Sequence, residues 1–245
     1  MGDKRVALVT GGARGIGRAI GLDLAGRGWD VAICYRSSEQ DAQTACEHMQ
    51  ERGARVLCAR ADVSEPSQVK TLVSQVTDEL GAVDAVVNAA GPYHRANLLE
   101  ETPEGWRAMF QNNLDPVFFT ALYATPAMID KKWGRILSFS MANADRVSAN
   151  TAVTAHFIAK MGVLSLSRAL AKELAPHGVT ANCISPGFVD SKSAPTDELL
   201  KMAKRIPAGH VGKVDDCVAA ARYFLSDEAS YVTGANLVVS GGWGL

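Results

Sequence analysis

The chain has 245 residues, of which 47% are hydrophobic and 21% charged, and its formal net charge is −1. This composition predicts a globular protein with a large core, and the near-zero charge gives no basis for a nucleic-acid partner or an anionic membrane surface. No apolar run is long enough to span a membrane, and the five scattered cysteines fit neither a disulfide framework nor a zinc site, so we expect a cytoplasmic protein without a metal.

Short β-branched runs alternate with longer amphipathic segments along the chain. Helices are expected between seven strands at 5–10, 30–35, 55–62, 83–90, 134–140, 178–185 and 235–242. The first helix should run from Gly15 to Gly28, and Ser64 should cap the third. Continuous Val, Ile and Ala runs indicate strands covered on both faces. We therefore predict one α/β domain over 1–245, a Rossmann-type, doubly wound parallel sheet of seven strands with helices on both faces.

The segment 190–212 interrupts this alternation. It holds two prolines, and glycines lie in and beside it, which disfavours a regular element there. Because such segments often cover a binding site, we expect 190–212 to be a substrate lid within the domain.

A glycine-rich turn, TGGARGIG (10–17), follows the first strand. Gly11, Gly15 and Gly17 allow a sharp turn and let the backbone approach a phosphate at the helix N-terminus. The spacing is GxxxGxG rather than the GxGxxG of the usual dinucleotide fingerprint. Its place between a strand and a helix favours a phosphate-binding turn over an ordinary tight turn.

The end of the second strand indicates which dinucleotide is bound. Proteins that bind NAD usually carry a carboxylate there, whereas this chain has Tyr35-Arg36-Ser37-Ser38 and no carboxylate before Glu39. Arg36, helped by Arg14 of the glycine turn, suits a 2′-phosphate through charge-assisted hydrogen bonds. The alternative is that both arginines are solvated surface residues. We predict NADP(H) rather than NAD.

Further motifs follow the glycine turn. They are Asp62-Val63, Asn88-Ala89-Ala90-Gly91, Pro186-Gly187 and the tail SDEASYVTGANLVVSGGWGL. Together they make the chain similar, over essentially its whole length, to the short-chain dehydrogenase/reductase (SDR) family, and most similar to its 3-oxoacyl-thioester reductase branch. The resemblance implies NADP(H) contacts from Gly11, Arg14, Gly15, Ile16, Gly17, Arg36, Ser37, Asp62, Val63, Asn88, Ala89, Ala90, Gly91, Lys160, Pro186, Gly187, Val189 and Ser191.

The resemblance also implies an altered catalytic site. The family's signature is Tyr-x-x-x-Lys, in which the tyrosine gives a proton to the substrate carbonyl oxygen. Here the lysine is Lys160, and His156 takes the tyrosine's place. The usual serine falls at Met141, beside Ser140, and Asn113 matches the family's active-site asparagine. The implied catalytic residues are Asn113, Ser140, His156 and Lys160.

A histidine changes the chemistry of proton donation. Its ordinary pKa is near 6.5, and a neighbouring ammonium such as that of Lys160 should lower it, leaving a mostly neutral ring at pH 7. The imidazole also ends roughly 2 Å closer to the backbone than a phenol oxygen, outside direct hydrogen-bond reach. A bridging water or a more deeply seated substrate would close that gap. Complete loss of proton donation would cost about 10²–10⁴ in rate.

Other residues are candidates for substrate contact. Tyr93 and His94 follow the Asn88–Gly91 motif directly, while Met141 and Asn143 follow the fifth strand. Each of these four has a structural alternative, such as a packed loop aromatic for Tyr93. The remaining histidines have no partners at metal-ligand spacing.

Three functions remain open at this point. The first is an NADPH-dependent reductase of a small-molecule or carrier-bound carbonyl, either a ketone or a 3-oxoacyl thioester. The second is an NADP(H)-binding homologue with impaired catalysis, acting as a sensor or partner subunit. The third is a non-redox enzyme that uses His156 as a base for cyclisation, dehydration or isomerisation.

The resemblance implies a homotetramer or homodimer as well, built from the helices of 102–130 and 153–176 and the C-terminal strand. The run PVFFTALYATPAMI (116–129) is apolar around most of its circumference. This pattern fits burial between subunits, although burial within one subunit would give the same pattern.

Overall fold

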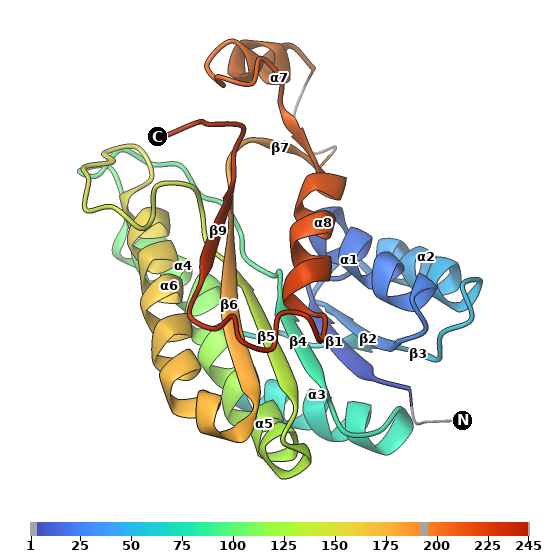
Figure 1. Ribbon diagram of the computed structural model, residues 1–245. Helices are drawn as coiled ribbons and strands as arrows, with labels where there is room; N and C mark the ends of the chain where they lie inside the picture. The colour runs from blue at the N-terminus through green and yellow to red at the C-terminus, as the bar shows by residue number, and fades with distance from the viewer. Residues whose placement is uncertain (1–3, 192–195, 245) are drawn as a thin grey trace.

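A seven-stranded parallel sheet forms the centre of the computed structural model, which describes residues 4–191 and 196–244 (Figure 1). The order β3-β2-β1-β4-β5-β6-β9 confirms the predicted doubly wound sheet. The strands are β1 (Val6–Thr10), β2 (Asp30–Tyr35), β3 (Val56–Arg60), β4 (Ala85–Asn88), β5 (Gly134–Phe139), β6 (Val179–Pro186) and β9 (Asn236–Val239).

Helices cover both faces of the sheet (Figure 1). One face carries α1 (Gly15–Gly26), α2 (Glu39–Gln50) and α8 (Val214–Phe224). The other carries α3 (Pro66–Glu79), α4 (Pro103–Asn113), α5 (Asp115–Lys131) and α6 (Thr154–Leu174), with the short 3₁₀ helix η1 (Ala175–His177) after α6. Among the described residues, no helix combines the length and the apolar character that a bilayer span requires.

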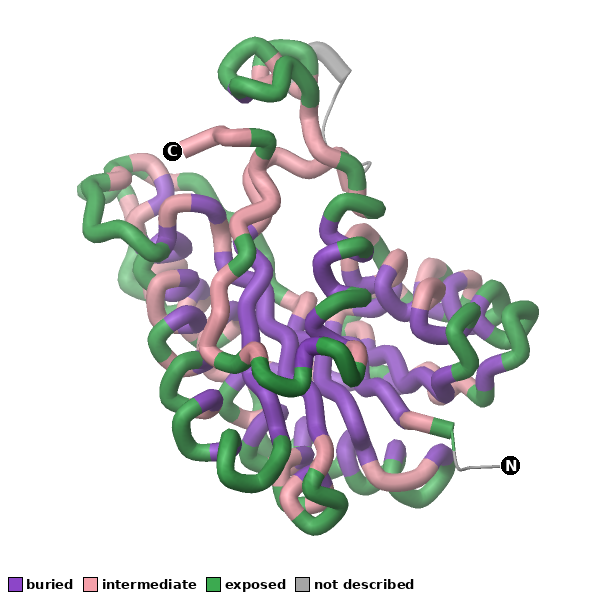
Figure 2. The backbone as a smooth tube through the Cα atoms, viewed as in Figure 1, coloured by how far each residue is buried: buried purple, intermediate pink, exposed green. Residues whose placement is uncertain are grey.

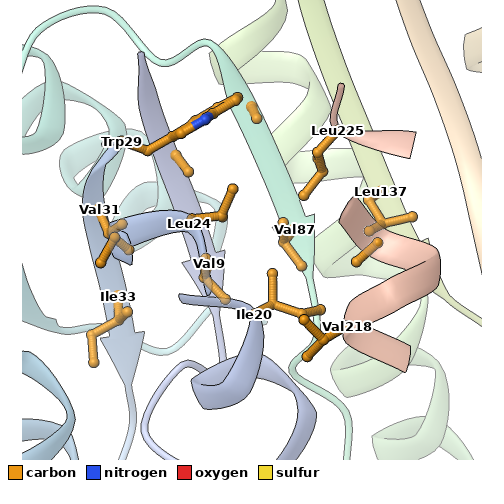
Figure 3. Packing of buried hydrophobic residues seen from close by; sticks show 14 of the residues in the cluster. Val9, Ile20, Leu24, Trp29, Val31, Ile33, Val87, Leu137, Val218 and Leu225 are labelled. Carbon is orange, nitrogen blue, oxygen red and sulfur yellow. The ribbon is translucent and has the colours of Figure 1, made fainter. Parts of the chain in front are cut away.

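The sheet is buried on both faces because successive side chains of each strand enter different layers. In β1, Ala7 and Val9 pack against the α1 side, while Val6 and Leu8 pack against the α3 side. Figure 2 shows the inner strands of the sheet buried and the outer sides of the helices exposed. Figure 3 shows Ile20 of α1 and Val218 of α8 beside the strand residues. This packing fixes the carboxyl ends of the strands, where the site lies.

The predicted cap of the third helix is wrong. The helix begins at Pro66, with Glu65 in the capping position. The Ser64 hydroxyl and backbone N–H instead donate to Asp62 Oδ1, at 2.7 and 3.0 Å. A serine just before a helix can bond either to the helix or to a preceding carboxylate, and here it bonds to the carboxylate.

The segment 190–212 contains more regular structure than its sequence indicates. It includes α7 (Thr196–Ala203), and β7 (Val189–Asp190) pairs in parallel with β8 (Gly212–Lys213) at its two ends. Residues 192–195 lie outside the described part of the chain. Figure 1 shows α7 projecting beyond the carboxyl edge of the sheet. Its role as a lid remains a prediction.

Candidate active site

Two adjoining cavities open at the carboxyl ends of the strands. They lie beside β1 and β4, where the strand order reverses, which is the usual place for a ligand in a doubly wound sheet. Their volumes are about 280 and about 1020 Å³, and both are lined by Arg14, Ala89 and Gly91. The two cavities together therefore suit an elongated ligand that crosses the glycine turn.

Close backbone packing requires glycine at two positions of the turn. A Cβ on Gly11, where φ is +65°, would lie 2.9 Å from Ala90 Cα, and one on Gly17 would lie 2.6 Å from the Gly11 oxygen. Gly11 therefore lets the ends of β1 and β4 approach, and Gly17 lets α1 pack under the turn. Arg14, in the N-cap position of α1, makes no capping hydrogen bond with its side chain, so this end of the helix can present its N–H groups to an anion.

Most of the residues expected to contact a cofactor line these cavities. They are Gly11, Arg14, Gly15, Ile16, Gly17, Arg36, Ser37, Asp62, Val63, Ala89, Ala90, Gly91 and Ser191. Five of the expected residues, all described, lie outside this lining: Asn88, Lys160, Pro186, Gly187 and Val189.

Asn88 has a structural role in the protein as it stands. Its Oδ1 accepts from Thr120 Oγ1 at 2.8 Å and its Nδ2 donates to Ser138 Oγ at 3.3 Å. The amide thus joins β4 to α5 and β5 beneath the site.

The two arginines expected at a 2′-phosphate have different surroundings. Arg36 Nη1 donates to Asn112 Oδ1 at 3.0 Å and lies 3.5 Å from Asp62 Oδ2, at the smaller cavity. Arg14 forms an ion pair with Asp41 of α2. Sequence reasoning missed Asn112, whose one signal is its place next to Asn113 on α4.

Asp62 is held as a carboxylate. Partial burial works to raise its pKa, but hydrogen bonds from Ser64 and the charge of Arg36 outweigh burial, so the pKa lies below its ordinary value. Asp62 therefore keeps its charge at neutral pH and helps to hold Arg36 at the cavity.

Lys160 is buried at the base of the site. Its ammonium donates to the Phe139 carbonyl at 2.9 Å, at the end of β5. Burial lowers its pKa to about 8, with the Cys183 thiol acting weakly in the opposite direction. The group is thus mostly charged at pH 7.

His156 lies one helical turn before Lys160 and is only 7% exposed. Burial, followed by the charge of Lys160, lowers its pKa to about 4, while the Pro92 carbonyl acts in the opposite direction. The imidazole is therefore neutral at pH 7, in agreement with the expectation from the sequence. Within the described residues, its buried Nδ1 has no hydrogen-bond partner.

This neutral histidine should make the fold sensitive to acid. The unfolded chain takes up a proton on His156 near pH 6.5, whereas the folded chain does not until about pH 4. Stability is therefore lost as the pH falls through that interval. The free energy of unfolding should decrease by about 3 kcal/mol more in the natural chain than in a His156→Phe variant. Urea unfolding of both proteins at several pH values between 7 and 4 measures this difference. If the free energy of unfolding fell equally with pH in both, His156 would not be the group responsible.

Asn113 and Lys160 converge on Gly91. A Cβ at Gly91 would lie 2.5 Å from Asn113 Oδ1 and 3.2 Å from Lys160 Nζ. Asn113 Nδ2 donates to the Met109 and Pro92 carbonyls, but its buried Oδ1 has no partner within the described residues. A buried acceptor without a donor is costly, so this corner fits a ligand that brings a hydroxyl or amide N–H.

The side chains from Ser140 to Asn143, directly after β5, offer no free hydroxyl proton. Ser140 Oγ donates to the Lys160 backbone carbonyl at 2.7 Å, which engages its proton. Met141 is half-buried and packs against the cluster that contains Phe157 and Leu164. Asn143 adopts φ +71°, a left-handed conformation that asparagine tolerates.

The loop after Gly91 brings an aromatic side chain to the histidine. The ring of Tyr93 lies 5.2 Å from that of His156, edge to face at 78°. Its neighbour His94 contacts Glu101 at 3.3 Å, so it is held within its own loop. The Leu98 N–H donates to the Thr151 carbonyl at 2.8 Å, which joins this loop to the one before α6.

The C-terminal tail lies against the same region. A Cβ on Gly244 would clash with the Asn143 side chain, and Arg146 Nη1 donates to the Gly244 carbonyl at 3.3 Å. The Trp243 and Phe188 rings meet with centroids 4.7 Å apart. The tail therefore contacts both the loop after β5 and the segment after β6. Across the described residues, no three His, Cys, Asp or Glu side chains are grouped to hold a metal ion.

Comparison with known families agrees with this geometry. A family model described as "Enoyl-(Acyl carrier protein) reductase" matches residues 11–244. The 3-oxoacyl-[acyl-carrier-protein] reductase FabG of Staphylococcus aureus is 34% identical over 239 residues, which cover 96% of each chain. The Escherichia coli FabG is 32% identical over 241 residues, covering 97% of this chain and 96% of its own.

Solved structures are similar over almost the whole chain. A blue fluorescent protein from a metagenomic library, in complex with NADPH, has a TM-score of 0.92, with 33% identity and 98% of both chains covered. A variant of the actinorhodin polyketide ketoreductase, with NADPH, has a TM-score of 0.91 and 28% identity, covering 99% of this chain and 98% of its own.

Proposed function

The chain belongs to the short-chain dehydrogenase/reductase family and is an NAD(P)-dependent short-chain oxidoreductase, and we propose that it reduces a ketone or 3-oxoacyl thioester with NADPH and an altered proton donor. One observation supports the proposal most directly. The glycine turn leads to a corner where the buried Lys160 ammonium and the Asn113 Oδ1, which has no partner among the described residues, converge on Gly91. That arrangement holds a donor and an acceptor ready for a ligand, although the phenol of the family is missing.

The residues at the two cavities fit NADP(H). The N-terminal N–H groups of α1 and the close approach allowed by Gly11 and Gly17 suit the pyrophosphate. Arg36 suits the 2′-phosphate and Asp62-Val63 the adenine, while Lys160 would hold the nicotinamide ribose. When bound, the reduced nicotinamide supplies a hydride for the carbonyl carbon.

The remaining implied contacts lie at the end of β6. We assign Pro186 and Gly187 to the nicotinamide. Gly187 packs closely on Ser240, since a Cβ on Gly187 would lie 2.8 Å from the Ser240 Cβ. Val189 belongs to β7, and Ser191 follows it. We assign these residues to the carboxamide and phosphates.

Arg36 should determine the preference for NADPH over NADH. An Arg36→Ala variant should bind NADPH about 10–100-fold more weakly, because it loses a charge-assisted contact to the 2′-phosphate, while its NADH affinity stays within about twofold. Calorimetric titration with both dinucleotides measures the ratio. Arg14→Ala should have the smaller effect, since Arg14 is paired with Asp41. An unchanged ratio in Arg36→Ala would assign the preference to another residue.

The proposed substrate class rests on the FabG relatives and on the residues around the site. The FabG proteins are named for 3-oxoacyl groups on an acyl carrier protein, and we extend that substrate class, carrier-bound or free, to this chain. Tyr93, His94, Met141 and Asn143 are the proposed substrate contacts, with 190–212 as the lid. Leu99, in the same loop as Tyr93 and His94, is 98% exposed, which suits contact with an apolar acyl group.

We further propose a homotetramer or homodimer that acts in the cytoplasm. Phe118 and Leu122 of α5 are each 49% exposed in the single chain, on the run expected to be buried between subunits. Covering such side chains would stabilise an assembly through α4, α5 and α6.

The direct test is NADPH consumption with a panel of ketones and 3-oxoacyl thioesters, alongside calorimetric titration with NADPH. Turnover above background supports the reductase. Tight NADPH binding without turnover favours the impaired homologue, which the engaged Ser140 hydroxyl and Met141 also support. Product formation without NADPH consumption would instead identify a non-redox use of His156.

A further inference from the structure

Tyr93 is a phenol close to the position where the family's phenol is missing. Its ring meets His156 edge to face, with centroids 5.2 Å apart. It follows Pro92, whose carbonyl accepts from Asn113 Nδ2 at 3.2 Å, so the backbone before Tyr93 is tied to the end of α4. Tyr93 is 64% exposed, so much of its side chain is accessible to solvent.

We propose that Tyr93 is the proton donor of this enzyme and that His156 positions its ring. The inference rests on the proposed reductase function. Hydride addition leaves a negative charge on the substrate oxygen. The Tyr93 O–H bond then breaks as a new O–H bond forms on that oxygen, which yields the neutral alcohol. The phenolate regains its proton from water, to which the exposed side chain has access.

The other groups of the site are poorly placed for this step. A neutral imidazole with a pKa of about 4 has no acidic proton to give at pH 7. The Lys160 ammonium is buried and donates to Phe139, and the Ser140 hydroxyl donates to the Lys160 carbonyl. Tyr93 is the one hydroxyl-bearing aromatic side chain that the described structure places against the histidine.

The position of His156 explains how an exposed tyrosine would be held. An edge-to-face ring contact restricts the aromatic side chain without using its hydroxyl, and it is worth about 0.5–1.5 kcal/mol. His156 is itself fixed by burial on α6. Two residues would therefore replace the family's tyrosine: Tyr93 on the loop donates the proton, and His156 on α6 holds the Tyr93 ring in place.

A double-mutant comparison separates this role from a structural one. The probe is the acetoacetyl thioester of N-acetylcysteamine, with NADPH as reductant. Tyr93→Phe should lower kcat about 10²-fold in the natural chain, with KM changed less than about threefold. In a His156→Tyr background the helix again carries a phenol, so Tyr93→Phe should change kcat less than about twofold. Equal losses in both backgrounds would overturn the assignment.

A binding measurement gives a second readout. With NADP⁺ present, the 3-hydroxybutyryl thioester of N-acetylcysteamine should bind about tenfold more weakly to Tyr93→Phe, because a hydrogen bond to the product hydroxyl is lost. NADPH affinity should not change. Tyr231→Phe is the matched control, since Tyr231 is fully exposed and precedes β9, at the opposite end of that strand from the site. Unchanged product affinity in Tyr93→Phe would overturn the proposal.

These measurements also separate a failure of the role proposed for Tyr93 from a failure of the proposed reductase function. If the natural chain consumes NADPH and Tyr93→Phe is equally fast, only the role of Tyr93 fails. If the natural chain consumes no NADPH with any carbonyl, the reductase function fails, and product binding still decides whether Tyr93 contacts the ligand hydroxyl.

Discussion

Replacing His156 by tyrosine and Met141 by serine together should raise kcat for a 3-oxoacyl thioester by about 10²–10³-fold. A phenol on α6 would lie one turn from the buried Lys160 ammonium, which favours the phenolate and so makes the phenol a stronger acid. A serine at 141 would add a hydrogen-bond donor to the developing oxyanion, and one such donor is worth about 10²–10³ in rate. Steady-state kinetics with saturating NADPH measures the gain.

The single variants show how much of the increase in kcat comes from each substitution. Met141→Ala is the matched control for Met141→Ser, because it removes the same bulk without adding a hydroxyl. His156→Phe likewise removes the imidazole without adding a phenol. A double variant no faster than the natural chain would contradict the view that the missing groups limit the rate. NADPH affinity should stay constant throughout, since neither residue lines the cavities assigned to the cofactor.

Replacing Lys160 by alanine should lower kcat/KM by about 10³-fold and weaken NADPH binding about tenfold. The ammonium converges with Asn113 on Gly91, so its removal takes a donor away from the position proposed for the ribose. It also leaves the Phe139 carbonyl without its partner at the end of β5. Two roles are lost at once, the electrostatic one in the reaction and the positioning one in binding.

Lys160→Met tests whether this loss is chemical or structural. Methionine keeps the unbranched shape and removes the charge, so it should preserve the melting temperature better than alanine while losing as much activity. Full activity in Lys160→Met would contradict the role assigned to the ammonium. A protein that binds NADPH normally but does not turn over would restrict Lys160 to the chemical step.

Repetition along the chain made most of the fold predictable. The inner strands β1, β2, β4, β5 and β6 are short, almost fully buried runs, and most strands of the central sheet are followed by a segment with helical spacing. The pattern of apolar residues within each segment is enough to predict such strands and helices. The Ser64 cap was wrong because Ser64 bonds to Asp62, two residues before it. Helix α7 was missed because the prolines and glycines in and beside 190–212 were taken to exclude a regular element there.

Contacts between distant segments made the site less predictable. The motifs located Gly91, Asn113 and Lys160, but sequence alone does not show that they converge. The bond between Arg36 and Asn112 joins residues 76 positions apart, and nothing in either local pattern indicates it. The contact of Tyr93 with His156 arises in the same way, from a loop and a helix that meet only in the folded chain.

The contact of the C-terminal tail with Asn143 has a practical consequence for making the protein. Any affinity tag or fusion partner appended after residue 245 would leave from beside Gly244, which already packs against the loop that follows β5. Such an extension would crowd the entrance and distort assays of the natural activity. Strand β1 begins at Val6, at the opposite end of the strands from the site (Figure 1). An affinity tag for purification is therefore better placed at the N-terminus.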